Sequence, residues 1–107
     1  MARRYLEDRG YTILGANLST DYGEIDLIAQ KDKRIFFVEI RRRRGLAYGP
    51  AIESISDTKK QHTRRSAQFL LLQNKAWQNL VPYLSVIAID ENERGETNLE
   101  FLPDAFT

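Results

Sequence analysis

The chain has 107 residues, of which 42% are hydrophobic and 29% are charged, so we expect residues 1–107 to form one small domain with a single core. It contains no cysteine, which excludes disulfides and thiolate metal sites and suits the cytoplasm, where we expect the protein to act. No apolar run approaches the ~20 residues that cross a bilayer, and no apolar segment of a signal peptide follows the basic start, so we expect no membrane partner.

The net charge of +1 conceals an uneven distribution along the chain. Residues 1–30 carry three basic and five acidic groups, residues 31–65 carry eleven and four, and residues 66–107 carry two and six. A local basic segment of this kind favours a polyanionic partner such as nucleic acid, although a basic face that only contacts solvent is the alternative. The candidates for phosphate contact are Arg42, Arg43, Arg44, Lys59, Lys60, Arg64 and Arg65.

The first residues predict a helix followed by a strand. Residues 2–9 are expected to form the helix, which Gly10 ends. No capping residue precedes this helix, so we expect the chain to lack its start. Residues 11–18 predict a strand, and the polar residues 19–23 predict a turn.

Residues 23–29 and 35–41 predict two more strands joined by a short polar turn. If this hairpin is symmetric about Asp32-Lys33, opposed residues have numbers that sum to 65, so Asp26 faces Glu39. A three-residue loop would instead place the two carboxylates on opposite faces, unless a bulge restored the register.

Alternation along the two strands gives each of them a charged face and an apolar face. The same register places Glu24 opposite Arg41, on the face that carries Asp26 and Glu39. The other face of the first strand would hold Ile25, Leu27 and Ala29.

The remaining residues predict a loop, a helix and two strands. The loop is marked by Gly45, Gly49 and Pro50. Ser56 or Asp57 can cap a helix that runs to about Gln78. Strands are expected at residues 83–90 and 99–102, with an acidic loop between them. The order of elements predicts an α/β fold with a mixed central sheet of about five strands, flanked by helices.

Two carboxylates that face each other in an apolar hairpin repel, and burying them without a counter-ion costs several kcal/mol or changes their protonation. A divalent cation between Asp26 and Glu39 would remove that cost. Mg²⁺ prefers one or two protein carboxylates with waters and phosphate oxygens, which suits phosphodiester cleavage with Arg41 neutralising charge. The alternative is a Glu24–Arg41 ion pair beside two solvated carboxylates.

The motifs of this chain resemble those of the bacterial YraN family of predicted endonucleases, which is similar to archaeal Holliday junction resolvases. The resemblance covers nearly the whole chain and rests on Tyr5-Leu6-Glu7, Gly10-Tyr11, Gly23 to Ile28, Phe37 to Arg41, Tyr48-Gly49, Lys60 and Asp104-Ala105-Phe106. It implies a restriction-endonuclease-like fold, a DNA partner that is structured or branched, Mg²⁺ or Mn²⁺ as cofactor, and a homodimer.

The resemblance also implies roles for individual residues. Asp26 and Glu39 would be the catalytic metal ligands, and Arg41 would stand in the position of the signature lysine. Glu24 would be an additional acidic residue, and Lys60 would be the basic residue on the following helix.

The chain departs from the family pattern at three places. Arg41 keeps the positive charge of lysine but is not a general base. A family glutamate is expected in the first helix upstream of Ala2. The last core strand begins Tyr83-Leu84-Ser85 where the family often has Arg-Phe-Asp. A nucleic-acid-binding module without catalysis and a protein-interaction domain are therefore the alternative functions.

Two further residues could have a functional role, His62 in catalysis and Tyr48 in contact with a nucleic acid. His62 is the only histidine and is expected to face solvent from a basic helical turn. Tyr48 could stack on an unpaired base from its loop, although packing on the surface is the alternative. No group of residues suggests base reading, so we expect recognition of shape.

Overall fold

The computed structural model describes residues 1–44 and 54–107, and these form two α-helices, a short 3-10 helix and five strands. The predicted loop residues Gly45, Tyr48, Gly49 and Pro50 lie outside the described residues. In chain order the elements are α1 (Ala2–Asp8), β1 (Thr12–Thr20), β2 (Gly23–Lys31), β3 (Arg34–Arg44), α2 (Asp57–Gln73), η2 (Lys75–Trp77), β4 (Val81–Glu91) and β5 (Thr97–Leu102).

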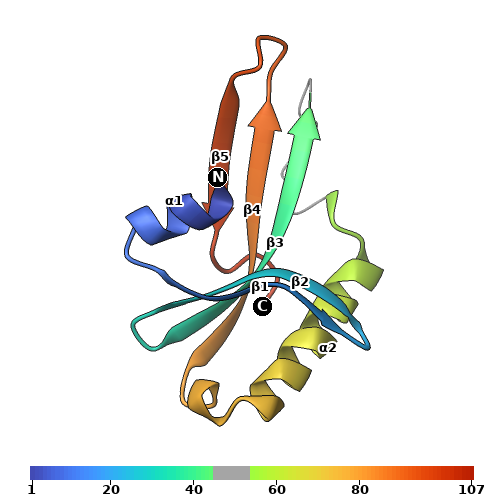
Figure 1. Cartoon of the computed structure of the whole chain (residues 1–107). Helices are drawn as coiled ribbons and strands as arrows, with labels where there is room; N and C mark the ends of the chain where they lie inside the picture. Colours follow the sequence, from blue (N-terminus) through green and yellow to red (C-terminus); the bar gives the residue numbers. More distant parts are fainter. Residues whose placement is uncertain (45–53) are drawn as a thin grey trace.

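The five strands form one sheet in the order β1-β2-β3-β4-β5. Only β3 and β4 are parallel, and α2 connects them, as a crossover helix must. The predicted α/β class with a mixed five-stranded sheet is therefore confirmed, and the architecture is consistent with a nuclease-like fold (Figure 1). Within the described residues, no helix has the length and apolar character needed to span a membrane.

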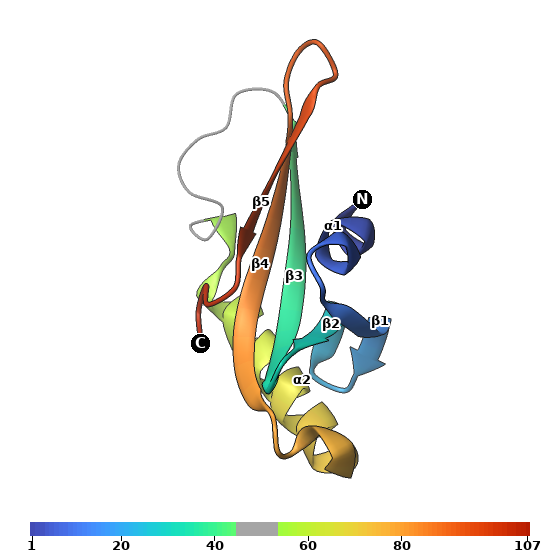
Figure 2. The ribbon, with the colours of Figure 1, turned by 90° about the vertical axis from the view of Figure 1, so that its left-hand side faces the viewer.

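The two α-helices pack on opposite faces of the sheet (Figure 2). The α1 face is lined by one group of buried residues, which includes Leu6, Leu27, Phe36, Val38 and Ile87. The α2 face is lined by a second group, which includes Ile28, Phe37, Ala67, Leu70 and Val86. Because side chains alternate along β3, Glu39 and Arg41 lie on one face, as the sequence predicts, and that face is the one that α2 covers.

The α2 helix begins as predicted but ends earlier. Ser56 is its N-cap, and the Ser56 hydroxyl accepts a hydrogen bond from the backbone N–H of Lys59 at 3.1 Å. The prediction that this helix continues to about Gln78 is wrong. Asn74 leaves the helical conformation, with φ −119° and ψ 93°, while its backbone N–H and its side chain both donate to the carbonyl of Leu70. These two bonds satisfy the end of the helix and make a stop at this point favourable.

The β2–β3 hairpin has the predicted register. Its pairs run from Lys31–Arg34 to Leu27–Val38, and the numbers in each pair sum to 65. Asp32 has φ 55°, a conformation that aspartate tolerates better than most residues, so the turn residues fit a tight connection.

Candidate metal and nucleic-acid site

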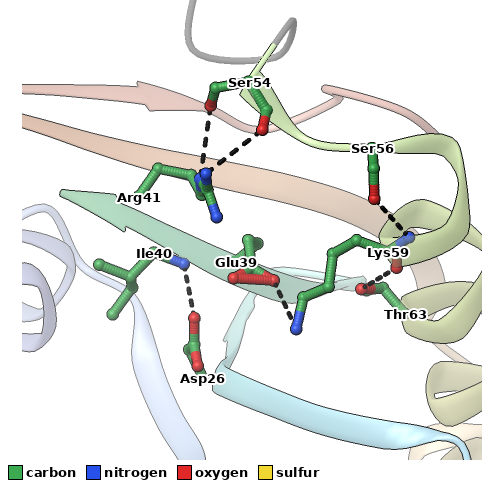
Figure 3. A network of polar contacts seen from close by, with 8 residues as sticks. All are labelled: Asp26, Glu39, Ile40, Arg41, Ser54, Ser56, Lys59 and Thr63. Atoms are coloured by element: carbon green, nitrogen blue, oxygen red, sulfur yellow. Dashed lines mark hydrogen bonds and ion pairs between the residues drawn. The ribbon is translucent and has the colours of Figure 1, made fainter. Parts of the chain in front are cut away.

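The pairing of β2 with β3 stops immediately before the two carboxylates. The last pair is Leu27–Val38, and in an antiparallel ladder the next hydrogen-bonded pair would be Ile25–Ile40. Instead, the Asp26 Oδ2 atom accepts a hydrogen bond from the backbone N–H of Ile40 at 2.8 Å (Figure 3). The Asp26 side chain therefore replaces a main-chain acceptor, and this bond holds its carboxylate against the strand that carries Glu39.

The alternation of side chains along β2 also changes at Asp26. Ile25 packs into the core on the α2 face, whereas Leu27 and Ala29 pack on the α1 face. The prediction that these three residues share one face is wrong for Ile25. On β1, Asn17 stands at the level of Asp26 and has φ 51°, so both strands are irregular here. The irregularity explains why the regular hairpin does not extend to Glu24.

Glu39 is a buried carboxylate between the sheet and α2. Its side chain is only 8% exposed, and its Oε2 atom lies 3.3 Å from the Nζ atom of Lys59 on α2. Burial raises the pKa of Glu39, and the negative charge of Asp26 together with a hydrogen bond to it raises that pKa further. The ammonium group of Lys59 acts in the opposite direction but does not cancel the other causes.

Asp26, Glu39 and Lys59 together form the carboxylate cluster, which has a formal charge of −1 when both acids are ionised. A second cation would offset this excess charge. Within residues 1–44 and 54–107, no group of three or more Asp, Glu, His or Cys residues is arranged to hold a metal. Two carboxylates are, however, the protein contribution that Mg²⁺ commonly takes when waters and substrate phosphates fill the other positions. The donor set therefore fits Mg²⁺ or Mn²⁺ at a substrate site better than a cation enclosed entirely by protein.

Glu24 and Arg41 do not oppose each other as predicted. Glu24 is exposed and pairs with Ser19 on β1, because the β2–β3 ladder has already ended. The guanidinium of Arg41 contacts the hydroxyl of Ser54 at 3.3 Å and donates to the Ser54 carbonyl at 3.2 Å. The structure thus brings Asp26 and Glu39 together and holds Arg41 beside the residues that precede α2 (Figure 3).

The sequence did not predict the contact between Lys59 and Glu39, because the resemblance placed Lys60 in the basic position near the site. The Nζ atom of Lys60 instead lies 3.9 Å from Asp57, one turn back on the same helix. Helical spacing contained the signal, since Lys59 precedes buried Thr63 by four residues and buried Ser66 by seven. Lys59 therefore shares the sheet-facing side of α2, whereas Lys60 is displaced to one side.

The arginines at the end of β3 are paired with acids on β4. Arg43 stands opposite Asp90 in the parallel register, with Nε 2.7 Å from Oδ1 and Nη2 2.9 Å from Oδ2. Arg44 stands opposite Glu91, at 3.4 Å. These acids offset much of the local positive charge, and they leave exposed Arg42 as the better candidate for a phosphate contact on this strand.

The two predicted arginines of α2 differ in the same way. Arg64 is half-buried and donates from Nη2 to the carbonyl of Phe106 at 2.8 Å, so it secures the C-terminal residues. Arg65 is exposed on the outer side of the helix. A phosphate could therefore reach Arg65 without breaking a contact that secures the fold.

Comparison with known proteins places the chain in a family. Residues 1–89 match the model of the Uncharacterised protein family UPF0102. The chain belongs to this family. A UPF0102 protein from Dictyoglomus turgidum is 34% identical over 95% of the chain and 86% of its own length. A UPF0102 protein from Syntrophotalea carbinolica is 35% identical over 99% of the chain and 85% of its own length. These matches confirm the resemblance that the motifs suggested.

Proposed function

We propose that this member of the UPF0102 family binds structured or branched DNA and cleaves its phosphodiester bonds with Mg²⁺ or Mn²⁺ held by Asp26 and Glu39. The observation that carries the proposal is the excess carboxylate at a buried position. Glu39 is 8% exposed, and its pKa is raised by burial and by Asp26 even though Lys59 lies beside it. A fold that keeps two interacting acids at such a site gains most from them when a cation binds there.

The residues around the carboxylates have separate roles in this proposal. The N–H of Ile40 fixes the Asp26 carboxylate beside Glu39, where both acids could contact one cation. Bound Mg²⁺ or Mn²⁺ would neutralise charge on the phosphate and lower the pKa of the attacking water. Lys59 would then turn from Glu39 to the phosphate, which would give the site the cation that Arg41 was expected to supply.

Binding to the DNA backbone would rest on the cations that are exposed and lightly engaged. On α2 this is Arg65, and on β3 it is Arg42, which alternation places on the α1 face. Lys60 is a weaker candidate, because its side chain is 22% exposed and lies 3.9 Å from Asp57. Arg43, Arg44 and Arg64, which the sequence also suggested, would contribute less because of the contacts described above. Glu24, which the resemblance implied as an additional acidic residue of the catalytic site, pairs with Ser19 on β1 and has no role in this proposal. A homodimer would present two such surfaces to a branched substrate.

The test is cleavage of a substrate panel that contains duplex, flap, four-way junction, single strand and RNA, with Mn²⁺ or Mg²⁺. We expect the wild type to cut at least one branched DNA, and Asp26→Asn or Glu39→Gln to lose about 100-fold or more of that activity while still binding DNA. Glu91→Gln is the matched control, because it removes a carboxylate that pairs with Arg44 outside the cluster. Equal activity in Glu39→Gln and Glu91→Gln would refute the proposed metal site.

A nucleic-acid-binding module without catalysis is the second candidate, and the position of Arg41 favours it. Its guanidinium is engaged by Ser54, so the cation in the signature position is held by another contact. This module would bind DNA with a steep salt dependence and cut no substrate at any metal concentration. If neither DNA nor RNA binds at low salt, both candidates fail, and a protein-interaction domain becomes the better account.

A further inference from the structure

The turn between β1 and β2 lies against α2 (Figure 1). It carries an exposed aromatic residue, Tyr22. The turn is held to the helix by the hydroxyls of Thr20 and Ser66, which are 2.8 Å apart. The ring of Tyr22 meets the ring of Phe69 edge to face, with centroids 6.3 Å apart and planes at 65°. Tyr22 is 43% exposed, whereas Phe69 is partly buried against the core, so Phe69 supports Tyr22 from behind.

A hollow of about 380 Å³ opens beside this aromatic pair. Its volume lies in the range of about 300–1,000 Å³ that is usual for small-ligand sites. It is lined by two aromatic rings, an aliphatic side chain, an amide and a guanidinium, from Tyr22, Phe69, Leu72, Gln68 and Arg65. A flat ring could stack in this hollow while Gln68 reaches its polar edge and Arg65 reaches a neighbouring phosphate.

The hollow lies on the helix that also carries Lys59 of the carboxylate cluster. Ten residues separate Lys59 from Phe69, which corresponds to about 15 Å along a helix. One strand of B-form DNA advances about 3.4 Å per nucleotide, so this separation corresponds to about four nucleotides. One strand could therefore reach both places.

We propose that Tyr22, Phe69, Arg65 and Gln68 form a subsite that stacks one unpaired base, about four nucleotides from the phosphate at the carboxylate cluster. The inference rests on the proposed function and narrows its substrate to nucleic acids with an unpaired nucleotide near the cut. A paired base stays stacked between its neighbours and cannot enter the hollow, whereas an unpaired base can be placed on an aromatic ring.

Local charge indicates which part of the nucleotide would enter. Asp21 and Glu24 flank the Tyr22–Gly23 turn, and both are exposed, so they oppose a phosphate at the turn itself. Arg65 is the cation of the hollow and comes from the helix side. The base would therefore contact the tyrosine, and the backbone would pass on the side of α2.

The test is binding of a 12-nucleotide single strand that carries one central 2-aminopurine, whose fluorescence reports its stacking. EDTA is present so that no cleavage occurs. The same strand in a full duplex is the paired comparison. We expect binding of the wild type to quench the fluorescence of 2-aminopurine in the single strand. Tyr22→Ala should weaken the affinity of the protein for the single strand about 5- to 100-fold, with little change in its affinity for the duplex. Tyr22→Phe keeps the ring and should bind as the wild type does.

Two control variants separate stacking from general loss of surface or charge. Val81→Ala removes an exposed apolar side chain that does not line the hollow, and Arg94→Ala removes an exposed cation from the β4–β5 turn. Neither should change quenching, whereas Arg65→Ala should weaken binding of the single strand. Thermal unfolding of each variant checks that the fold is kept.

The outcomes distinguish this inference from the proposed function. If Tyr22→Ala binds the single strand as the wild type does, while Glu39→Gln abolishes cleavage, the subsite is wrong and the nuclease stands. If Tyr22→Ala loses affinity but no substrate is ever cut, the subsite stands and the nuclease fails. Equal losses for single strand and duplex would overturn the subsite, because stacking on an unpaired base would then not be the cause.

Discussion

Two groups of opposite charges on this sheet have different compositions. Arg43 and Asp90 form a one-to-one pair between neighbouring parallel strands, with contacts of 2.7 and 2.9 Å. The carboxylate cluster has two acids for one lysine, and its lysine contact is longer, at 3.3 Å. The first group has one cation for one acid, whereas the second has one negative charge for which no partner is found among residues 1–44 and 54–107. We infer that the Arg43–Asp90 pair stabilises the contact between β3 and β4, whereas the carboxylate cluster serves to bind a cation.

The largest expected effect is the loss of stability when the basic residue of each group is replaced. Arg43→Met leaves Asp90 half-buried without its partner, so we expect the free energy of unfolding to fall by about 2 kcal/mol. Lys59→Met should cost less, about 1 kcal/mol, because the lysine side chain is 37% exposed and because Glu39, whose pKa is already raised, can take up a proton when the lysine is lost. Urea unfolding measures both values. Added Mg²⁺ should recover the loss in Lys59→Met only, and recovery in Arg43→Met as well would remove the distinction.

The pH dependence of stability is the next effect in size. The raised pKa of Glu39 means that the folded protein keeps this proton at pH values where the unfolded chain has lost it. The contribution of Glu39 to the free energy of unfolding is therefore fully present below the ordinary glutamate pKa of 4.5. This contribution is lost as the pH rises through the raised pKa of the folded protein. Each unit of the shift corresponds to about 1.4 kcal/mol.

Glu39→Gln measures this contribution directly. Relative to the wild type, the variant should gain stability between acid and neutral pH in the absence of metal, because glutamine has no proton to lose. Urea unfolding at several pH values, with Glu91→Gln as the control, gives the comparison. If the free energies of unfolding of the wild type and Glu39→Gln differ by the same amount at all pH values, the pKa of Glu39 is not raised by folding.

The smallest expected effect concerns the dependence of DNA binding on salt. Arg65 and Arg44 are both exposed, but Arg44 lies 3.4 Å from the carboxylate of Glu91. Arg65→Ala should lower the slope of log affinity against log salt by about 1, the amount expected for one phosphate contact. Arg44→Ala should change the slope less. The reverse order would mean that the end of β3, and not α2, follows the DNA backbone.

The local pattern of residues predicted the hairpin well. The sums of 65 followed from the sequence on the condition that the turn is symmetric about Asp32-Lys33, and the structure meets that condition. Alternation also placed Glu39 and Arg41 on one face, and residue type narrowed the cap of the long helix to Ser56 or Asp57, of which the structure has Ser56.

Contacts between distant elements could not be predicted in the same way. The end of the ladder depends on Asp26 competing with a backbone carbonyl for the N–H of Ile40, and alternation gives no sign of that competition. The pairing of Arg43 with Asp90 depends on the register of two parallel strands 47 residues apart in sequence. The choice of Lys59 over Lys60 depends on the rotation of α2 about its axis against the sheet.

Thermal unfolding with increasing Mn²⁺ tests most directly whether the carboxylate cluster binds a divalent cation. The unfolding temperature of the wild type should rise with Mn²⁺, by about 5 °C or more once the concentration is well above the dissociation constant. Asp26→Asn and Glu39→Gln should lose this rise, and Asp90→Asn should keep it from a lower starting temperature. An unchanged wild type, or an equal rise in Glu39→Gln, would contradict the account.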